Sequence, residues 1–171
     1  MKQPAQFSLK NGIQCAFQNR RSTVAHVAVA IKAGSRDELA HQQGLAHFIE
    51  HNLFKGTDRR KAFHILSRLD DVGGELNAYT TKEETIIHAS FLKGDVRRAL
   101  DLISDVLYSS TFPQRELEKE KEVIKDEISS YKDSPGERIF DDFEELVFEN
   151  DPLGRNILGT PESVDALSRE G

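Results

Sequence analysis

Apolar residues recur along the chain with two different spacings, one typical of strands and one of helices. Residues 24–32 and 85–92 are nearly continuous apolar runs of the length of a strand, and such runs favour β-strands. Because the first run is apolar at successive positions, we expect it in the interior of a sheet. Residues 6–9 and 13–18 flank the tripeptide Lys-Asn-Gly at 10–12, and its Asn-Gly pair predicts a hairpin turn.

Amphipathic helices are predicted where apolar residues return every three or four positions. The clearest example covers residues 95–109, DVRRALDLISDVLYS. Others are expected at residues 41–54, 61–72, 114–132 and 137–149, with a short helical start near residue 161. The double glycine at 73–74 stands where a C-terminal cap would end a helix, and the Pro-Gly pair at 135–136 is expected to interrupt the chain before the last long helix. This order of strands and helices predicts an α+β fold with a largely antiparallel sheet.

Charge and composition narrow the class of protein. The 171 residues carry 23 Lys+Arg against 29 Asp+Glu, a formal net charge of −6, and without a basic block we expect no nucleic-acid partner. No apolar run has the length of a membrane span, so no membrane partner is expected, and the first residues lack the apolar core of a secretory signal. We therefore expect a single globular domain in the cytoplasm, although a processed precursor would have the same features. The only cysteine, Cys15, excludes an internal disulfide and a multi-cysteine zinc site.

The segment GLAHFIEH at 44–51 carries the residues with the clearest chemistry. On a helix, His47 and His51 are one turn apart, so both imidazoles project from one face and can bind a single Zn²⁺. Glu50 lies on the same side and could take a proton from a zinc-bound water without binding the metal itself. This His-x-x-Glu-His order is the inverted form of the zinc-peptidase motif His-Glu-x-x-His. The alternative interpretation is two surface histidines and a solvated glutamate on an ordinary amphipathic helix.

A catalytic zinc ion usually has three protein ligands and one open position, so this site requires a third ligand. The remaining histidines and the cysteine are weak candidates, because they stand in strand-like runs, on another face or on another helix: His26, His41, His64, His88 and Cys15. A carboxylate is the natural alternative.

Two glutamates of the predicted helix 114–132 are suitably placed. Glu120 and Glu127 are seven residues apart, which puts them on one stripe of the helix, with Ile124 between them. Spacing alone does not separate Glu127 from the other glutamates of this helix, most of which we expect to pair with lysines at i,i+4. Those alternatives are Glu116, Glu118 and Glu122.

Three segments together resemble the signatures of the pitrilysin/insulysin family of zinc peptidases: GLAHFIEHNLFKGT, GGELNAYTTKEET and EKEVIKDEI. The likeness covers about residues 7–167 and is closest to the branch of mitochondrial and bacterial processing peptidases. It implies that residues 1–171 are an N-terminal catalytic domain of a zinc endopeptidase, with one Zn²⁺ ion bound by His47, His51 and Glu127. Glu50 would be the catalytic base, and Glu120 would orient the ligands from behind.

The same resemblance implies how a peptide substrate would bind. Residues Asn77, Ala78, Tyr79 and Thr80 would form an exposed sheet edge beside the zinc, to which a peptide adds as a strand through backbone hydrogen bonds. Without the resemblance, this stretch is only a polar strand start after a double-glycine turn.

The chain departs from the pattern of that family in two ways. Asn52 stands where the family usually has methionine, for which we expect only an adjustment of packing. Members of the family also pair this domain with a second, similarly folded domain or subunit. We therefore expect a truncated domain with weak or no peptidase activity in isolation, whose uncovered edge and cleft favour association.

Two other functions remain possible for a chain with these residues. One is a catalytically silent structural relative of the same fold, which would be expected to lose metal ligands. The other is an iron oxidoreductase that uses two histidines and one carboxylate, although Glu50 has no evident role in oxygen chemistry.

Overall fold

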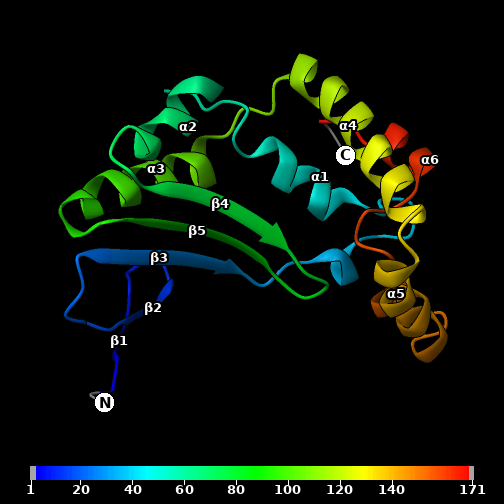
Figure 1. Ribbon diagram of the computed structural model, residues 1–171, viewed down its shortest axis with the longest axis horizontal. Helices are drawn as coiled ribbons and strands as arrows, with labels where there is room; N and C mark the ends of the chain where they lie inside the picture. Colours follow the sequence, from blue (N-terminus) through cyan, green and yellow to red (C-terminus); the bar gives the residue numbers. More distant parts are fainter. Residues whose placement is uncertain (1–2, 170–171) are drawn as a thin grey trace.

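A three-stranded antiparallel sheet forms the centre of the molecule, which is described here from a computed structural model for residues 3–169 (Figure 1). The strands are β3 (Val24–Ile31), β4 (Glu75–Thr80) and β5 (Thr85–Leu92), in the order β3-β5-β4. Ile87 of β5 pairs with Val29 on one side and with Ala78 on the other. A separate antiparallel hairpin, β1 (Ala5–Ser8) and β2 (Gln14–Phe17), confirms the turn predicted at the Asn-Gly pair.

The strand expected in the sheet interior is instead an edge strand. In β3, Ala25, Val27 and Val29 are half-buried against the core, while the residues between them are exposed. The interior position belongs to β5, in which most residues are buried. The prediction failed because the outward positions of β3 include Ala28 and Ala30, whose methyl groups are apolar but small enough to face solvent at little cost.

Two helices cover one face of the sheet: α2 (Ala62–Asp70) and α3 (Val96–Ser109) (Figure 1). Together they enclose a cluster that we call the sheet core, formed by Leu53, Ile65, Leu69, Ala78, Ile87, Ala89, Phe91, Ala99, Leu102, Ile103 and Val106. Gly73, with a φ of +70°, follows α2, and the N–H of Gly74 donates to the carbonyl of Leu69 at 2.9 Å. The glycine cap predicted for this helix is thereby confirmed.

Of the remaining helices, the first packs beside β4, and the others lie beyond the ends of the strands (Figure 1). They are α1 (Leu45–Asn52), α4 (Gln114–Lys132), α5 (Pro135–Val147) and α6 (Pro161–Ala166). A second cluster, which we call the helix core, is formed by Phe48, Leu117, Ile124, Ile128, Val164 and Leu167. It joins α1 to α4 and α6, so it sets the distance between the helix with the His-x-x-Glu-His motif and the helix with the candidate glutamates.

Two helix boundaries differ from those expected. Helix α1 begins at Leu45 rather than near residue 41, because Gly44 at its start has a φ of +89°. Helix α5 includes the Pro-Gly pair expected to precede it, since proline is well tolerated in a first helical turn. None of the residues of α5 is buried, and its side chains Phe140 and Leu146 are 72% and 80% exposed. Of the helices described, none has the length and apolarity needed to span a membrane.

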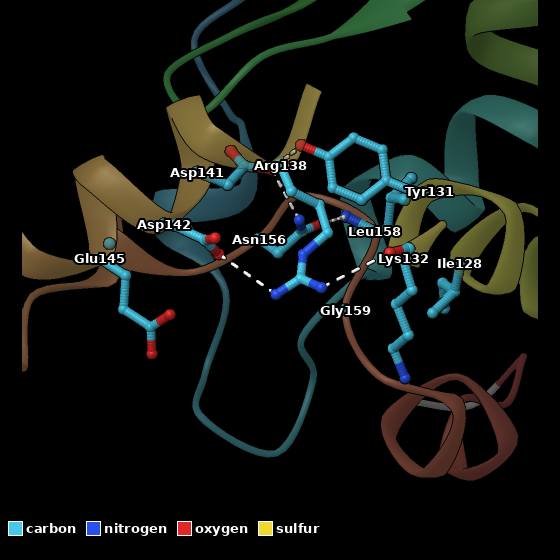
Figure 2. A pocket seen from close by; sticks show the side chains of 11 residues that line it. Ile128, Tyr131, Lys132, Arg138, Asp141, Asp142, Glu145, Asn156, Leu158 and Gly159 are labelled. Atoms are coloured by element: carbon cyan, nitrogen blue, oxygen red, sulfur yellow. Dashed lines mark hydrogen bonds and ion pairs between the residues drawn. The ribbon is translucent and has the colours of Figure 1, made fainter. Parts of the chain in front are cut away.

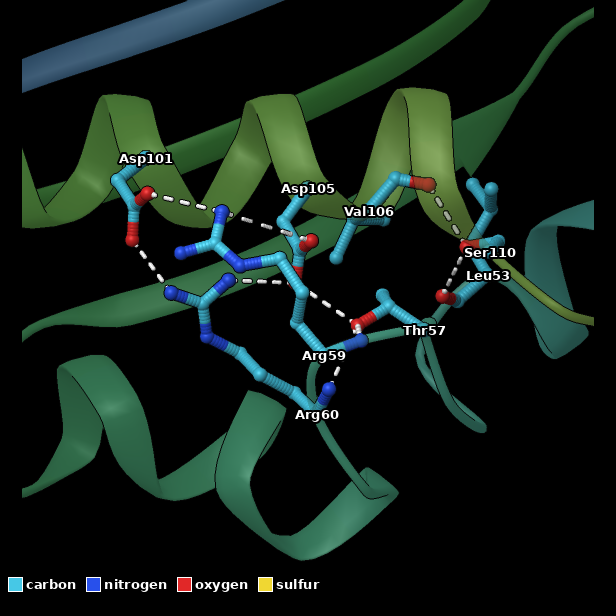
Figure 3. Close-up of polar contacts among 8 residues, drawn as sticks. All are labelled: Leu53, Thr57, Arg59, Arg60, Asp101, Asp105, Val106 and Ser110. Carbon is cyan, nitrogen blue, oxygen red and sulfur yellow. Dashed lines mark hydrogen bonds and ion pairs between the residues drawn. The ribbon is translucent and has the colours of Figure 1, made fainter.

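The segment after α1 is fixed to α3 by a cluster of ionised side chains (Figure 3). Arg60 donates from Nη1 to Asp105 and from Nη2 to Asp101, both at 2.5 Å, and Thr57 Oγ1 donates to Asp105 at 2.8 Å. Burial alone would raise the pKa of Asp105, but hydrogen bonds from Arg60 and Thr57 outweigh it and hold that pKa below its ordinary value. This end of α1 is therefore anchored to the sheet core.

Candidate metal centre

Helix α1 presents His47 and His51 toward α4, with their ring centroids 4.4 Å apart. His47 is buried and its side chain is 10% exposed, while that of His51 is 21% exposed. Burial, and then the neighbouring His51, lower the pKa of His47 from 6.5 to about 4. At neutral pH His47 is therefore the neutral imidazole, which is the form that binds a metal ion.

Glu127 of α4 approaches both imidazoles. Its Oε2 atom lies 3.7 Å from Nε2 of His47 and 3.5 Å from Nε2 of His51. These distances exceed the usual N–H···O length of about 2.7–3.2 Å, but they are close to the roughly 3.3 Å that separates two ligands of a tetrahedral Zn²⁺ ion. One donor atom from each residue lies within 4.8 Å of the others. The spacing of the three side chains therefore suits joint binding of one cation better than direct hydrogen bonds between them.

The same helix places Glu120 behind His51. Its Oε2 atom is 3.2 Å from Nδ1 of His51, and its Oε1 atom accepts a hydrogen bond of 2.6 Å from Lys55 Nζ. Only 10% of the Glu120 side chain is exposed. A carboxylate in this position fixes the ring orientation of His51, so that Nε2 faces Glu127.

The register of α4 explains which of its glutamates face α1. Leu117, Ile124 and Ile128 are buried in the helix core, and Glu120 and Glu127 lie on the neighbouring stripe. The other candidates form ion pairs with lysines at i,i+3, a spacing one residue shorter than expected: Glu116 with Lys119, Glu118 with Lys121, and Glu122 with Lys125. The geometry thus separates Glu127 from the alternatives that spacing left open.

The other histidines and the cysteine lie outside this cluster. His26 is exposed and contacts Ser90, His41 and His64 are exposed, and His88 lies beside the ring of Tyr79. Cys15 is half-buried in β2. Within residues 3–169, His47, His51 and Glu127 form the one group with metal-binding geometry.

Glu50 lies on α1 beside the metal candidates without joining them. Burial raises the pKa of its carboxyl above the ordinary value, against the opposing effect of hydrogen bonding to Thr80. Together with His47, Glu127, Tyr79 and Thr80 it lines a cleft of about 330 Å³. This arrangement leaves Glu50 available for proton transfer within the cleft.

Strand β4 forms the other border of that cleft. It pairs with β5 on one side and is an edge of the described sheet on the other. Tyr79 is 48% exposed, and Thr80 Oγ1 donates to the carbonyl of Ala46 in α1 at 3.5 Å. Of the edge predicted at residues 77–80, Tyr79 and Thr80 therefore line the cleft with His47 and Glu127, whereas Ala78 is 7% exposed and belongs to the sheet core.

Asn52, at the end of α1, is fully buried. Its Nδ2 donates to the carbonyl of Phe48 at 2.8 Å, while Oδ1 has no partner among the described residues. A methionine at this position would avoid burying an unpaired polar atom.

A polar cluster that also lines this cleft was not predicted from the sequence; Figure 2 shows its residues. Tyr131 Oη and Asn156 Nδ2 both donate to Oδ2 of Asp141, at 2.5 and 2.7 Å. Burial, and then this carboxylate, raise the pKa of Tyr131 above its ordinary value. The three residues come from α4, α5 and the loop before α6, and the only available signal was that Tyr131 lies one helical turn after Glu127.

An antiparallel sheet covered by helices, with a His-x-x-Glu-His helix facing a carboxylate from a later helix, defines the class of the inverted zinc peptidases. Residues 15–161 match the family model described as insulinase, peptidase family M16. The chain therefore belongs to that family, as its three sequence signatures indicated.

Curated relatives carry the names of peptidases. The chain is 39% identical over 164 residues to a probable mitochondrial-processing peptidase subunit beta of Arabidopsis thaliana, covering 95% of this chain and 31% of that protein. It is 38% identical over 164 residues to an uncharacterized zinc protease of Bacillus subtilis, covering 95% of this chain and 40% of that protein. The chain thus spans less than half the length of these relatives.

Solved structures confirm the α+β fold. A protease from Helicobacter pylori matches 98% of this chain and 41% of its own, with 24% identity and a TM-score of 0.92. A peptidase M16 inactive domain from Pseudomonas fluorescens matches 99% of this chain and 42% of its own, with 17% identity and a TM-score of 0.90. At these identities the likeness shows the fold alone.

Proposed function

We propose that this chain is the metal-binding and catalytic part of a zinc-dependent endopeptidase that hydrolyses peptides or unfolded segments. The observation that carries the proposal is the convergence of His47, His51 and Glu127 beside Glu50. His47, Glu50 and Glu127 line a cleft bordered by the edge of β4, and His51 belongs to the same metal-binding group. The names of the zinc-protease relatives support the choice of metal.

The proposed ligands fit Zn²⁺ because two imidazoles and one carboxylate are its usual donors in hydrolytic sites. Zn²⁺ bound there would polarise the scissile carbonyl and lower the pKa of its water to about 7. Glu120 would hold His51 in its ligand orientation, and Lys55 would hold Glu120 in turn.

Glu50 has the position and the electrostatics of a general base. A base works best when its pKa lies near the working pH, and burial moves the pKa of Glu50 upward. It would accept the proton of the attacking water and pass it to the leaving amine.

A peptide would bind as an additional strand along residues 77–80. The backbone groups of β4 on its unpaired side can accept and donate the hydrogen bonds of a further strand, and Tyr79 and Thr80 bring that strand to the cleft. Because backbone groups would carry the recognition, substrates of varied sequence could bind.

A second domain or subunit is part of the proposal, because the matched relatives and structures are more than twice as long as this chain. The residues described here would then be weakly active alone. A simple check is to compare cleavage by this chain with cleavage by the longest natural protein that contains it; equal activity would contradict the requirement.

The alternative is a catalytically silent member of the family. An inactive domain has the same fold, so the fold alone does not decide between the two. The donor set favours catalysis, because His47, Glu50 and Glu127 line one cleft and His51 lies within 3.5 Å of Glu127.

The test is a Glu50→Gln variant of the full-length protein. We expect peptide cleavage to fall by about 10²- to 10⁴-fold while the zinc content is unchanged. Glu122→Gln is a matched control, because this side chain is 74% exposed on α4, and it should cleave normally. Normal cleavage by Glu50→Gln would exclude Glu50 as the base, and an absence of cleavage and zinc in the unmodified protein would favour the silent relative.

A further inference from the structure

The first turn of α1 lacks a cap from its own N-cap residue. That residue is Gly44, which has no side chain to accept a hydrogen bond. The first four N–H groups of any helix have no partner within the helix, and an isolated helix of eight residues is only marginally stable. The helix that carries His47 in its first turn therefore depends on contacts from elsewhere.

Glu38, six residues before Gly44, supplies those contacts. Its Oε2 accepts the N–H of Gly44 at 2.9 Å, and its Oε1 accepts the N–H of Ala46 at 2.7 Å. One carboxylate thus satisfies two N–H groups of the helix end, and its negative charge also lies at the positive end of the helix dipole.

The segment from Glu38 to Gly44 is itself held by the loop before α6 and by the first turn of α6. Arg155 Nη1 donates to the backbone carbonyl of Glu38 at 3.0 Å. A Cβ at Gly44 would lie 2.7 Å from the carbonyl oxygen of Leu158, so the two backbones are in close contact. Ser163 Oγ donates to the carbonyl of Gln43 at 2.8 Å. The contacts place Glu38 against the start of α1 before any ligand binds.

The two hydrogen bonds to Glu38 also determine the position of His47. Ala46, whose N–H is bonded to Glu38, directly precedes His47, and no described residue bonds to Nδ1 of His47. Among the described residues, no side chain hydrogen-bonds Nδ1 of His47 in the way that Glu120 contacts Nδ1 of His51. The backbone conformation of the first turn therefore sets the orientation of His47 toward Glu127.

We propose that Glu38 is a positioning residue for the metal site: it holds the first turn of α1 in the conformation that presents His47 to the cation. The inference rests on the proposed function, in which His47 is a metal ligand. When a binding-competent conformation is only partly populated, the apparent dissociation constant rises by the reciprocal of that population. Loss of the hydrogen bonds to Glu38 should therefore weaken metal binding even where the rest of the chain stays folded.

The experiment is a zinc titration of the metal-free chain against a chromogenic chelator, with circular dichroism recorded on the same samples. For Glu38→Gln we expect a dissociation constant about tenfold higher, in line with the effect of residues that support metal ligands, and an unchanged spectrum. The matched control is Glu83→Gln, because Glu83 is 69% exposed and pairs with Arg36; it should bind zinc as the unmodified chain does.

A second variant addresses the case in which Glu38→Gln fails to fold. Arg155→Gln keeps the carboxylate and loosens only the segment that carries it, and we expect a dissociation constant about threefold higher. Unchanged zinc affinity in a folded Glu38→Gln, or in Arg155→Gln when the first variant does not fold, would overturn the inference. If the unmodified chain binds no more zinc than His47→Ala, the proposed function fails as well, which distinguishes the two results.

Discussion

The sheet core and the helix core are built from the same kinds of aliphatic and aromatic side chain, but they border very different surroundings. The sheet core lies between β-strands and the helices α2 and α3, and its main ionised neighbours are those of the Arg60–Asp105 cluster on the outer side. The helix core joins the two helices that carry the candidate ligands: Phe48 follows His47 on α1, and Ile124 lies between Glu120 and Glu127 on α4. A side chain in the first stabilises the fold, while one in the second also fixes the distance between metal ligands.

The largest expected difference concerns the ligands themselves. His47→Ala or His51→Ala removes one of three donors, and we expect zinc affinity to fall by at least about 100-fold. His64→Ala is the control on the sheet side, because His64 is exposed on α2, and its zinc affinity should be unchanged. Isothermal titration with zinc would show this, and equal affinities in all three variants would remove His47 and His51 from the site.

Core truncations should separate the two clusters. Ile103 and Ile124 are 2% and 0% exposed, so either change to alanine should reduce the free energy of unfolding by about 2–5 kcal/mol. Only Ile124→Ala should also weaken zinc binding, because Ile124 lies between Glu120 and Glu127 on α4. Urea unfolding combined with a zinc titration measures both effects. A similar loss of zinc affinity in Ile103→Ala would contradict the distinction between the clusters.

A smaller effect on the free energy of unfolding is expected from a change of pH. The folded pKa of His47 is lowered to about 4 by burial, so the unfolded chain binds a proton there that the folded chain rejects. The resulting stabilisation is complete above about pH 6.5 and is lost as the pH falls toward 4. We expect the metal-free chain to lose about 2–3 kcal/mol more than a His47→Gln variant between pH 7 and pH 4.5.

Urea unfolding at the two pH values provides the measurement for this prediction. A His41→Gln variant should follow the unmodified chain, because His41 is exposed. If His47→Gln showed the full pH dependence of the unmodified chain, the burial of His47 in its neutral form would be refuted.

The elements that sequence predicted well are those set by local pattern. Strand β5 and helix α4 have the bounds expected from their apolar spacing, and the glycine cap of α2 followed from Gly73. The position of β3 at an edge of the sheet could not be predicted from the sequence. An alanine counts as apolar in the pattern whether its side chain is buried or exposed. The start of α1 depends on the close contact of Gly44 with Leu158, which joins distant parts of the chain.

The candidate site shows the same division. The paired histidines and Glu50 could be predicted from their spacing within one helical turn. Glu127 could be chosen only through the family resemblance, because helix spacing alone was consistent with four glutamates. Glu38 and Asp141 were not predicted, since their roles come from hydrogen bonds to segments far along the chain, such as Arg155 and Asn156.

The most direct test of the central claim is the location of zinc by anomalous diffraction from crystals grown with the metal. We expect one strong peak within about 2.0–2.2 Å of Nε2 of His47, Nε2 of His51 and a carboxylate oxygen of Glu127. Glu50 should be nearby and unligated. A peak bound elsewhere, or one with Glu127 turned away from it, would contradict the account.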